Sequence, residues 1–328
     1  MTKTSTLRRV SQLLHEAQQP LLICHVAPDG DALGSLTGLA RALRSMGLSP
    51  IAACADPIPA SCDYIPGVES VVQDVNDFFD LVVAIDCSDP ARLGRFQELP
   101  HFDQHPLINI DHHVTNVNFG DVDLVDPRAA ATAQLVLRLL DHLEVRLDET
   151  LATCLLVGLV TDTRGFRTDN VNSQVMRAAV RLMDAGASLP YVVQHGLDRR
   201  PLSVIRVWGA ALSRLRFEDG IVWSSMPLEM RRRVGYQGDS DAGLASFLLS
   251  AEDARVALVL VEREDRAIDV GLRAAPGFDV ARVALRFGGG GHVLAAGFET
   301  EGPLEAAEER VLEVLRRELR SQRCSSDA

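Results

Sequence analysis

Lysine is almost absent from this sequence of 328 residues, in which Lys3 is the single lysine among 33 basic side chains. Acidic side chains number 45, which gives the chain a net charge of −12. Because long duplex nucleic acid binds basic surfaces, a chain this acidic is a poor match for it. We therefore expect a small or short ligand. Any cationic contact to that ligand must come from arginine, histidine or a bound metal.

The sequence also lacks long apolar runs and CxxC cysteine pairs. No run approaches the roughly 20 apolar residues that cross a bilayer, and the first 20 residues have no signal-peptide core. The six cysteines are dispersed, and several lie in apolar runs, where cysteine behaves as a small hydrophobe. We expect a reduced, cytoplasmic protein without structural disulfides and without a membrane partner.

Strand-like and helix-like segments alternate in the first half of the chain. Short apolar runs predict strands at 21–27, 81–85 and 107–110. Apolar residues at helical spacing predict helices at 33–46, 131–143, 150–159 and 173–186, with Ser173 as the N-cap of the last helix. This alternation indicates an α/β domain with a mostly parallel sheet flanked by helices.

The pattern changes after residue 188. Residues 188–216 carry no strand signal and are interpreted as a partly helical connector. Beyond them we predict strands at 221–225, 255–262 and 267–274 and helices at 242–249, 279–287 and 304–320. The predicted organisation is a first domain at 1–188, a connector at 189–216 and a smaller α+β domain at 217–328.

Aspartate and histidine gather directly after four buried apolar runs. These four segments contain His25, Asp29 and Asp31; Asp86; Asp111, His112 and His113; and Asp162. The carboxyl ends of parallel strands meet at one edge of a sheet, which forms the ligand crevice in such folds. Taken singly, the aspartates could be turn or capping residues and the histidines could be core residues. Four such placements together favour a site.

Carboxylates crowded at one edge repel one another unless a cation neutralises them. Oxygen ligands with one or two imidazoles suit Mn²⁺ or Mg²⁺ better than a thiolate-binding metal. Six side chains are too many for one octahedral ion that keeps open positions: His25, Asp29, Asp31, Asp86, His112 and Asp162. They suit two ions that share a carboxylate and activate water for attack on a phosphoryl group.

Five motifs in this order resemble a known family. HVAPDGDALGS, VVAIDCSDPARLG, INIDHH and GLVTDT resemble the four motifs of the DHH phosphoesterases. FGGGGHVLAAG resembles the glycine-rich signature of the DHHA1 domain that accompanies them. The resemblance extends over about residues 20 to 300. It implies a DHH domain joined to a DHHA1 domain, with the active site in the cleft between them.

The resemblance also implies roles for individual residues. One Mn²⁺ would be held by His25, Asp29 and Asp86, and the other by Asp31, Asp86, His112 and Asp162, with Asp86 bridging. His113 would face the substrate phosphate, and Asp111 would support the histidines. The nucleophile in the family is a water or hydroxide between the metals. Mg²⁺ or Co²⁺ could substitute for Mn²⁺.

Candidate substrate-binding residues lie in the second domain. Four glycines precede His292, and since such a run is costly in backbone entropy, a close approach of Gly289, Gly290 and Gly291 to a ligand is one explanation. A flexible loop is the other. In the strand at 267–274, Arg273 projects from the face opposite the apolar residues, where it could fork onto a phosphate or simply be solvated. The resemblance matches both His292 and Arg273 to substrate-binding positions.

The leading hypothesis is an Mn²⁺-dependent phosphoesterase of the oligoribonuclease and pAp-phosphatase branch. It would hydrolyse short RNA oligonucleotides and dephosphorylate 3′-phosphoadenosine 5′-phosphate (pAp), without binding long duplexes; a homodimer is compatible with the sequence. A soluble cyclic-dinucleotide or linear-dinucleotide phosphodiesterase is the alternative within enzymes, and the larger recombination exonuclease and manganese pyrophosphatase fit less well. A non-catalytic nucleotide or RNA-end binder is the alternative from another class, although it has no need for six metal ligands.

Overall fold

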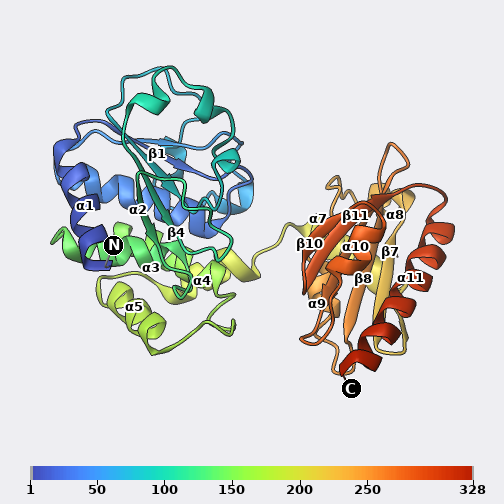
Figure 1. Ribbon diagram of the computed structural model, residues 1–328. Helices are drawn as coiled ribbons and strands as arrows, with labels where there is room; N and C mark the ends of the chain where they lie inside the picture. Colours follow the sequence, from blue (N-terminus) through green and yellow to red (C-terminus); the bar gives the residue numbers. More distant parts are fainter. Residues whose placement is uncertain (1–2, 327–328) are drawn as a thin grey trace. The chain divides into compact units, whose positions relative to one another are not determined.

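The computed structural model describes residues 3–326 and divides the chain into two compact units between Arg199 and Arg200 (Figure 1). That division falls within the segment predicted as a connector. The segment contains α6 (Leu189–Val193), a π-helix (Gln194–Asp198) and α7 (Leu202–Leu212). Each unit has its own sheet and its own apolar core.

The first unit is built on a sheet of five parallel strands in the order β2-β1-β3-β4-β5. The strands are β1 (Pro20–Cys24), β2 (Ile51–Ala53), β3 (Leu81–Ile85), β4 (Leu107–Asp111) and β5 (Val122–Val125). The predicted parallel sheet is confirmed. We did not predict β2 or β5, because a run of three or four residues is too short to give a periodic signal.

Helices α1 (Lys3–Glu16), α2 (Gly30–Ser45) and α3 (Thr132–His142) pack on one face of this sheet. Helices α4 (Glu149–Asp162) and α5 (Ser173–Asp184) pack against α2 and α3. The opposite face packs against Leu93, Phe96 and Phe102 of short 3₁₀ segments. The helix expected to begin at a Ser173 cap is capped instead by Asn172, whose side chain accepts hydrogen bonds from the amides of Gln174 and Val175.

Glycine lets α2 and α4 approach each other closely. A Cβ atom at Gly34 would lie 2.4 Å from the carbonyl oxygen of Cys154, and one at Gly30 would lie 2.6 Å from the hydroxyl of Thr161. On the other helix, a Cβ at Gly158 would lie 2.4 Å from an Asp31 carboxylate oxygen. The close contact brings Asp31 on α2 beside the end of α4, where Asp162 lies.

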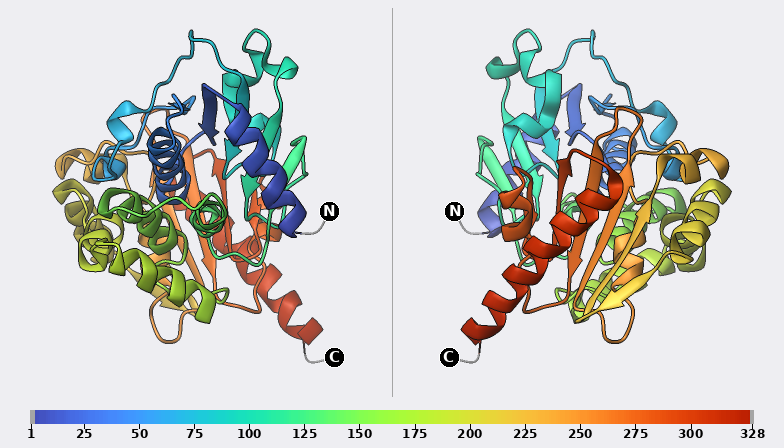
Figure 2. Two further views of the ribbon diagram at one scale, coloured as in Figure 1. Left: turned by 90° about the vertical axis from the view of Figure 1, so that its left-hand side faces the viewer. Right: turned by 90° about the vertical axis from the view of Figure 1, so that its right-hand side faces the viewer.

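The second unit contains a mixed sheet of six strands in the order β10-β11-β9-β8-β7-β6. The strands are β6 (Arg216–Glu218), β7 (Ile221–Met226), β8 (Val256–Glu262), β9 (Ile268–Ala274), β10 (Gly290–His292) and β11 (Ala295–Thr300). Helices α7, α8 (Leu228–Arg233) and α9 (Leu244–Leu248) pack on one face, and α10 (Ala281–Arg286) and α11 (Leu304–Ser326) on the other. Figure 2 shows α11 lying across the strands.

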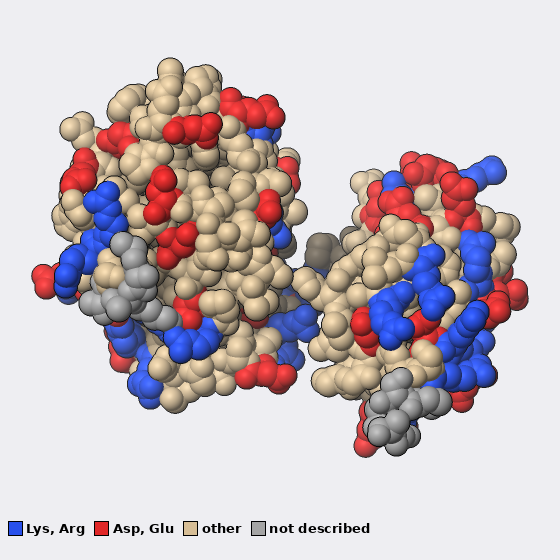
Figure 3. Space-filling model, viewed as in Figure 1, with Lys and Arg blue, Asp and Glu red and all other residues tan. Residues whose placement is uncertain are grey.

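Acidic and basic side chains are mixed on the visible surface of each unit (Figure 3). The five cysteines whose side chains are described are all free thiols. Among the described residues, no helix is both long enough and apolar enough to cross a membrane.

Candidate active site

The first unit brings the predicted metal ligands together at one edge of its sheet. His25 directly follows β1, Asp86 directly follows β3, and Asp111 ends β4 and leads into His112 and His113. Asp162 does not come from the end of a strand: it is the last residue of helix α4, which the sequence predicted at 150–159. A short buried apolar run such as LLVGLV does not by itself distinguish a strand from a buried helix.

One group of ligand atoms consists of His25, Asp29 and Asp86. The Nε2 atom of His25 lies 3.5 Å from Asp86 Oδ2 and 3.9 Å from Asp29 Oδ1. The other ring nitrogen of His25 lies 2.8 Å from the carbonyl oxygen of Val26, which orients the ring. Asp29 is the N-cap of α2 and accepts hydrogen bonds from the amides of Asp31 and Ala32 through Oδ1.

A second group consists of Asp31, His112 and Asp162. The Nε2 atom of His112 lies 3.4 Å from Asp162 Oδ2 and 3.9 Å from Asp31 Oδ2. The same nitrogen lies 3.7 Å from Asp86 Oδ1. Asp86 therefore faces both groups, with one carboxylate oxygen toward each.

These separations fit ligands of a small divalent ion. In an octahedron with bonds of about 2.1 Å, neighbouring ligand atoms lie about 3.0 Å apart and opposite ones about 4.2 Å apart. The distances of 3.4 to 3.9 Å fall between these values. The donors are carboxylate oxygens and imidazole nitrogens, which suit Mn²⁺ or Mg²⁺.

The electrostatics of the carboxylates also favour a cation. Burial, with the charges of Asp86, Asp162 and Asp29, raises the pKa of Asp31 well above its usual value. Burial, with the charges of Asp86 and Asp29, raises the pKa of Asp162 to about 6. Although burial opposes ionisation of Asp86, a hydrogen bond from His25 and the charge of His112 lower its pKa to about 2. A divalent ion would stabilise all of these groups in the charged form.

The first turn of α3 supports two of the carboxylates, a contribution we did not predict. The amide of Thr132 donates to Asp31 Oδ2 over 2.6 Å, and the amide of Ala133 donates to Asp31 Oδ1 over 3.0 Å. The Thr132 hydroxyl donates to Asp86 Oδ1 over 2.7 Å. A threonine at the start of a predicted helix was the available signal, but it is also a common residue at helix starts.

Asp111 holds His113 in place from beneath the site. Its buried carboxylate lies 2.7 Å from His113 Nδ1 and accepts a hydrogen bond from Asn116 over 2.5 Å. The hydrogen bond to Asp111 raises the pKa of His113 to about 8. Because Nδ1 is engaged and 37% of the side chain is exposed, the Nε2 atom of His113 is available to a ligand.

In the second unit, the residues predicted to bind substrate lie on β9 and on or just before β10, two strands that flank β11. The register places Arg273 of β9 opposite Ala295 of β11, and Ala295 opposite His292 of β10, so that all three share one face of the sheet. His292 is exposed, and Arg273 donates a hydrogen bond to the carbonyl oxygen of Leu272.

The glycine run before His292 is partly a strand, and internal packing explains some of it. A Cβ at Gly289 would lie 2.3 Å from the carbonyl oxygen of Gly297, and one at Gly291 would lie 2.5 Å from that of Ala295. Glycine is therefore required at both positions by the closeness of β11. Only Gly290 of the predicted three has no atom within 4 Å of a Cβ, which leaves space there for a ligand.

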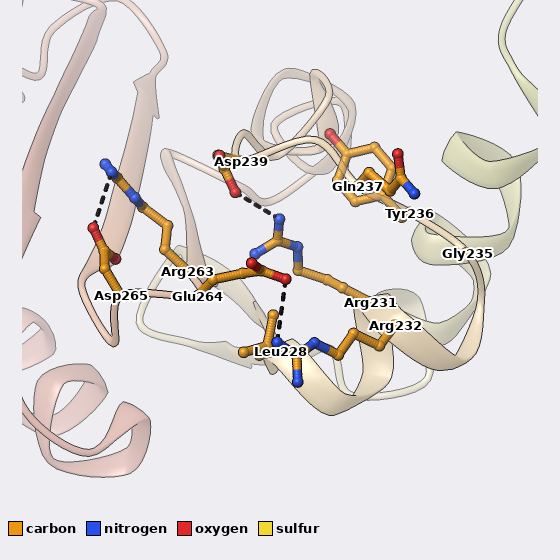
Figure 4. Close-up of a pocket in the computed structure, with 10 residues that line it drawn as sticks. All are labelled: Leu228, Arg231, Arg232, Gly235, Tyr236, Gln237, Asp239, Arg263, Glu264 and Asp265. Atoms are coloured by element: carbon orange, nitrogen blue, oxygen red, sulfur yellow. Dashed lines mark hydrogen bonds and ion pairs between the residues drawn. The ribbon is translucent and has the colours of Figure 1, made fainter.

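A separate cavity in the second unit contains none of the predicted site residues (Figure 4). Its three arginines are already paired, Arg231 with Asp239, Arg232 with Glu264 and Arg263 with Asp265. Because each cation faces a carboxylate, we do not assign a substrate to this cavity.

Comparison with known proteins gives two domain matches. Residues 20–159 match the model of the DHH family, N-terminal domain, and residues 231–321 match that of the DHHA1 domain. The bifunctional oligoribonuclease and PAP phosphatase NrnA of Thermus thermophilus is 36% identical over 95% of this chain and 94% of its own length.

Two solved structures share the fold. An exopolyphosphatase-related protein from Bacteroides fragilis has a TM-score of 0.86 at 23% identity, over 97% of this chain and 96% of that one. RecJ from Thermus thermophilus, solved in complex with Mn²⁺, has a TM-score of 0.54 at 17% identity, over 95% of this chain and 55% of that one. The predicted α/β architecture with a second, smaller domain is confirmed.

Proposed function

Because the chain belongs to the DHH/DHHA1 family of phosphoesterases, we propose that it hydrolyses short RNA oligonucleotides to mononucleotides and removes a phosphate from pAp. The chain is a phosphodiesterase or phosphatase. The observation that carries it is the pair of ligand groups that share Asp86 at one sheet edge. The name of the Thermus thermophilus relative supports the substrate class.

Two divalent ions, which we infer to be Mn²⁺, would supply Lewis-acid activation of water and of the phosphoryl group when bound there. We assign one ion to His25, Asp29 and Asp86 and the other to Asp31, Asp86, His112 and Asp162. The amides and hydroxyl at the start of α3 hold Asp31 and Asp86 in fixed orientations, so that the ligands are positioned before metal enters.

His113 is assigned the contact to the scissile phosphate. Its Nδ1 atom is held by Asp111, and its Nε2 atom can donate a hydrogen bond to a phosphate oxygen. In the second unit, Arg273 and His292 share one sheet face and are assigned the terminal phosphate of the substrate, with Gly290 leaving space beside them. The arginine can form two parallel hydrogen bonds to a phosphate.

Rates on a panel of substrates test this function. The Mn²⁺-loaded protein is incubated with labelled RNAs of two to ten nucleotides, pAp, cyclic di-AMP and pyrophosphate. We expect the highest rates on the shortest RNAs and on pAp, with the rate per molecule falling as RNA lengthens. Faster degradation of long RNA would assign the chain to a processive exonuclease, and a preference for cyclic di-AMP would assign it to a cyclic-dinucleotide phosphodiesterase.

A further inference from the structure

Three aromatic rings pack together beside the candidate active site in the first unit. The ring centroids of Tyr191 and His195 lie 4.1 Å apart with an interplanar angle of 33°. The Tyr64 ring lies 5.6 Å from His195 and 6.3 Å from Tyr191. The three residues come from different segments, the loop before Ile65, helix α6 and the π-helix that follows it.

The π-helix places the histidine of this cluster. The His195 Nδ1 atom lies 2.8 Å from the carbonyl oxygen of Tyr191, which turns the imidazole toward the tyrosine rings. A single π-turn is rare, and such turns are frequent at functional sites. Residues 194–198 were predicted only as part of a partly helical connector, so the sequence alone did not indicate this arrangement.

Contacts connect the cluster to the candidate metal ligands. A Cβ at Gly196 would lie 2.5 Å from the Tyr64 hydroxyl oxygen and 3.2 Å from the Thr161 methyl group. Thr161 in turn lies against Gly30, where a Cβ would be 2.6 Å from its hydroxyl. Gly30 separates Asp29 from Asp31, and Thr161 precedes Asp162. Gly196 and Thr161 therefore connect the aromatic cluster to the two segments that carry Asp29, Asp31 and Asp162.

The cluster is open to solvent, unlike one that serves only as core. Tyr191 is 40% exposed, and Tyr64 and His195 are half-buried. Among the described residues, no hydrogen bond joins the hydroxyl of Tyr64 or of Tyr191 to the protein. Because 40% of Tyr191 is exposed, its ring is accessible to water or to a ligand.

We propose that Tyr64, Tyr191 and His195 form a platform on which one nucleobase of the RNA substrate stacks. Specifically, the base belongs to the nucleotide that is present in a dinucleotide and absent from pAp. Every base has a flat aromatic face, so such a platform binds RNA of any sequence. This inference rests on the proposed function. The platform would explain how the protein binds dinucleotides, since a dinucleotide has one base on each side of the scissile phosphate.

A comparison of KM for the two proposed substrates distinguishes base stacking from a purely structural role of the cluster. A dinucleotide has a second base to stack, whereas in pAp the scissile phosphate has a nucleoside on one side only. Tyr191→Ala should raise KM for a 5′-phosphorylated dinucleotide by about fivefold to 150-fold, the range for loss of one stacked base. KM for pAp should stay within twofold of wild type. Tyr191→Phe keeps the ring and should restore the dinucleotide KM.

Phe78 provides a matched control in the same unit. It is 67% exposed and packs edge-on against His105 at a centroid distance of 6.4 Å. It precedes β3, whereas the metal ligand Asp86 follows that strand, so the pair lies at the opposite end of the sheet. Phe78→Ala should therefore leave both KM values unchanged.

A spectroscopic readout tests stacking without turnover. A dinucleotide carrying 2-aminopurine as its second base is mixed with EDTA-treated protein, and its fluorescence should be quenched by wild type and by Tyr191→Phe but not by Tyr191→Ala. An unchanged dinucleotide KM in Tyr191→Ala, or an equal rise in the KM for pAp, would overturn the platform. If wild type hydrolyses neither substrate, the proposed function fails instead. Melting temperatures identify a variant that has not folded, for which Tyr191→Leu replaces Tyr191→Ala.

Discussion

The contact between Gly158 and Asp31 makes a strong prediction about a residue that touches no substrate. A Cβ at position 158 would lie 2.4 Å from Asp31 Oδ1 and 2.7 Å from Ala133 Cβ. The carboxylate cannot turn away freely, because the amides of Thr132 and Ala133 hold it over 2.6 and 3.0 Å. Gly158→Ala must therefore displace a proposed metal ligand or separate α4 from α2 and α3.

The magnitude follows from opposing effects. Alanine favours the helix by about 1 kcal/mol over glycine. Overpacking costs about 1–3 kcal/mol, and weakening one hydrogen bond to the buried carboxylate costs about 1.5–3 kcal/mol. We expect Gly158→Ala to lower the free energy of unfolding by about 1.5–5 kcal/mol, and Mn²⁺ affinity to fall with it.

Gly209→Ala is the matched control. Gly209 lies in helix α7 with no atom within 4 Å of a Cβ, so alanine should stabilise the protein by up to about 1 kcal/mol. Urea unfolding and Mn²⁺ titration of both variants provide the comparison. If Gly158→Ala is as stable as wild type and binds Mn²⁺ equally well, the close packing of α2, α3 and α4 does not position Asp31.

Two further predictions concern pH and the second unit. The pKa of Asp162, about 6, and that of His113, about 8, are raised in the folded state, so each group stabilises the fold at low pH and this contribution is lost as pH rises through the folded value. The melting temperature of EDTA-treated protein should therefore fall between pH 5 and 8, and it should fall less steeply in Asp162→Asn. Added Mn²⁺ should raise the melting temperature most at the higher pH. A metal-free protein whose melting temperature rises over this interval would contradict the raised pKa values of Asp162 and His113. Arg273→Ala and His292→Ala should each raise KM for dinucleotide and pAp about tenfold or more through loss of a charge-assisted phosphate contact, while Mn²⁺ content by elemental analysis stays at the wild-type level. Loss of bound metal from these variants would show that the second unit takes part in metal binding.

Sequence patterns predicted the parts of the fold that depend on long apolar runs. Strands β1, β3 and β4 are buried along their whole length or nearly so, and their ends deliver His25, Asp86 and Asp111 as expected. The short strand β10 was not predicted, because a glycine-rich segment has no side-chain periodicity and pairs only through its backbone with β11. The helix predicted at 150–159 is present as α4, but only the structure shows that its last residue, Asp162, reaches the same site as the residues at the strand ends.

Contacts between segments far apart in the chain could not be predicted from sequence patterns. Thr132 supports Asp31 and Asp86, which lie 101 and 46 residues away along the chain. The packing role of Gly30, Gly34 and Gly158 is visible only in the structure, where α2 and α4 are in contact. The aromatic cluster likewise joins Tyr64 to two residues beyond position 190, and no local spacing links them.

The most direct test of the central claim is the rate of dinucleotide hydrolysis by Asp86→Asn in saturating Mn²⁺. Asp86 is the carboxylate that faces both groups of ligands, and asparagine keeps its shape and its hydrogen bond from Thr132 while removing its charge. If the two groups form one hydrolytic centre, the variant should fold, bind less Mn²⁺ than wild type and lose at least about a thousandfold in rate, in line with the loss of a charged catalytic group. Normal Mn²⁺-dependent turnover in a folded Asp86→Asn protein would contradict the account.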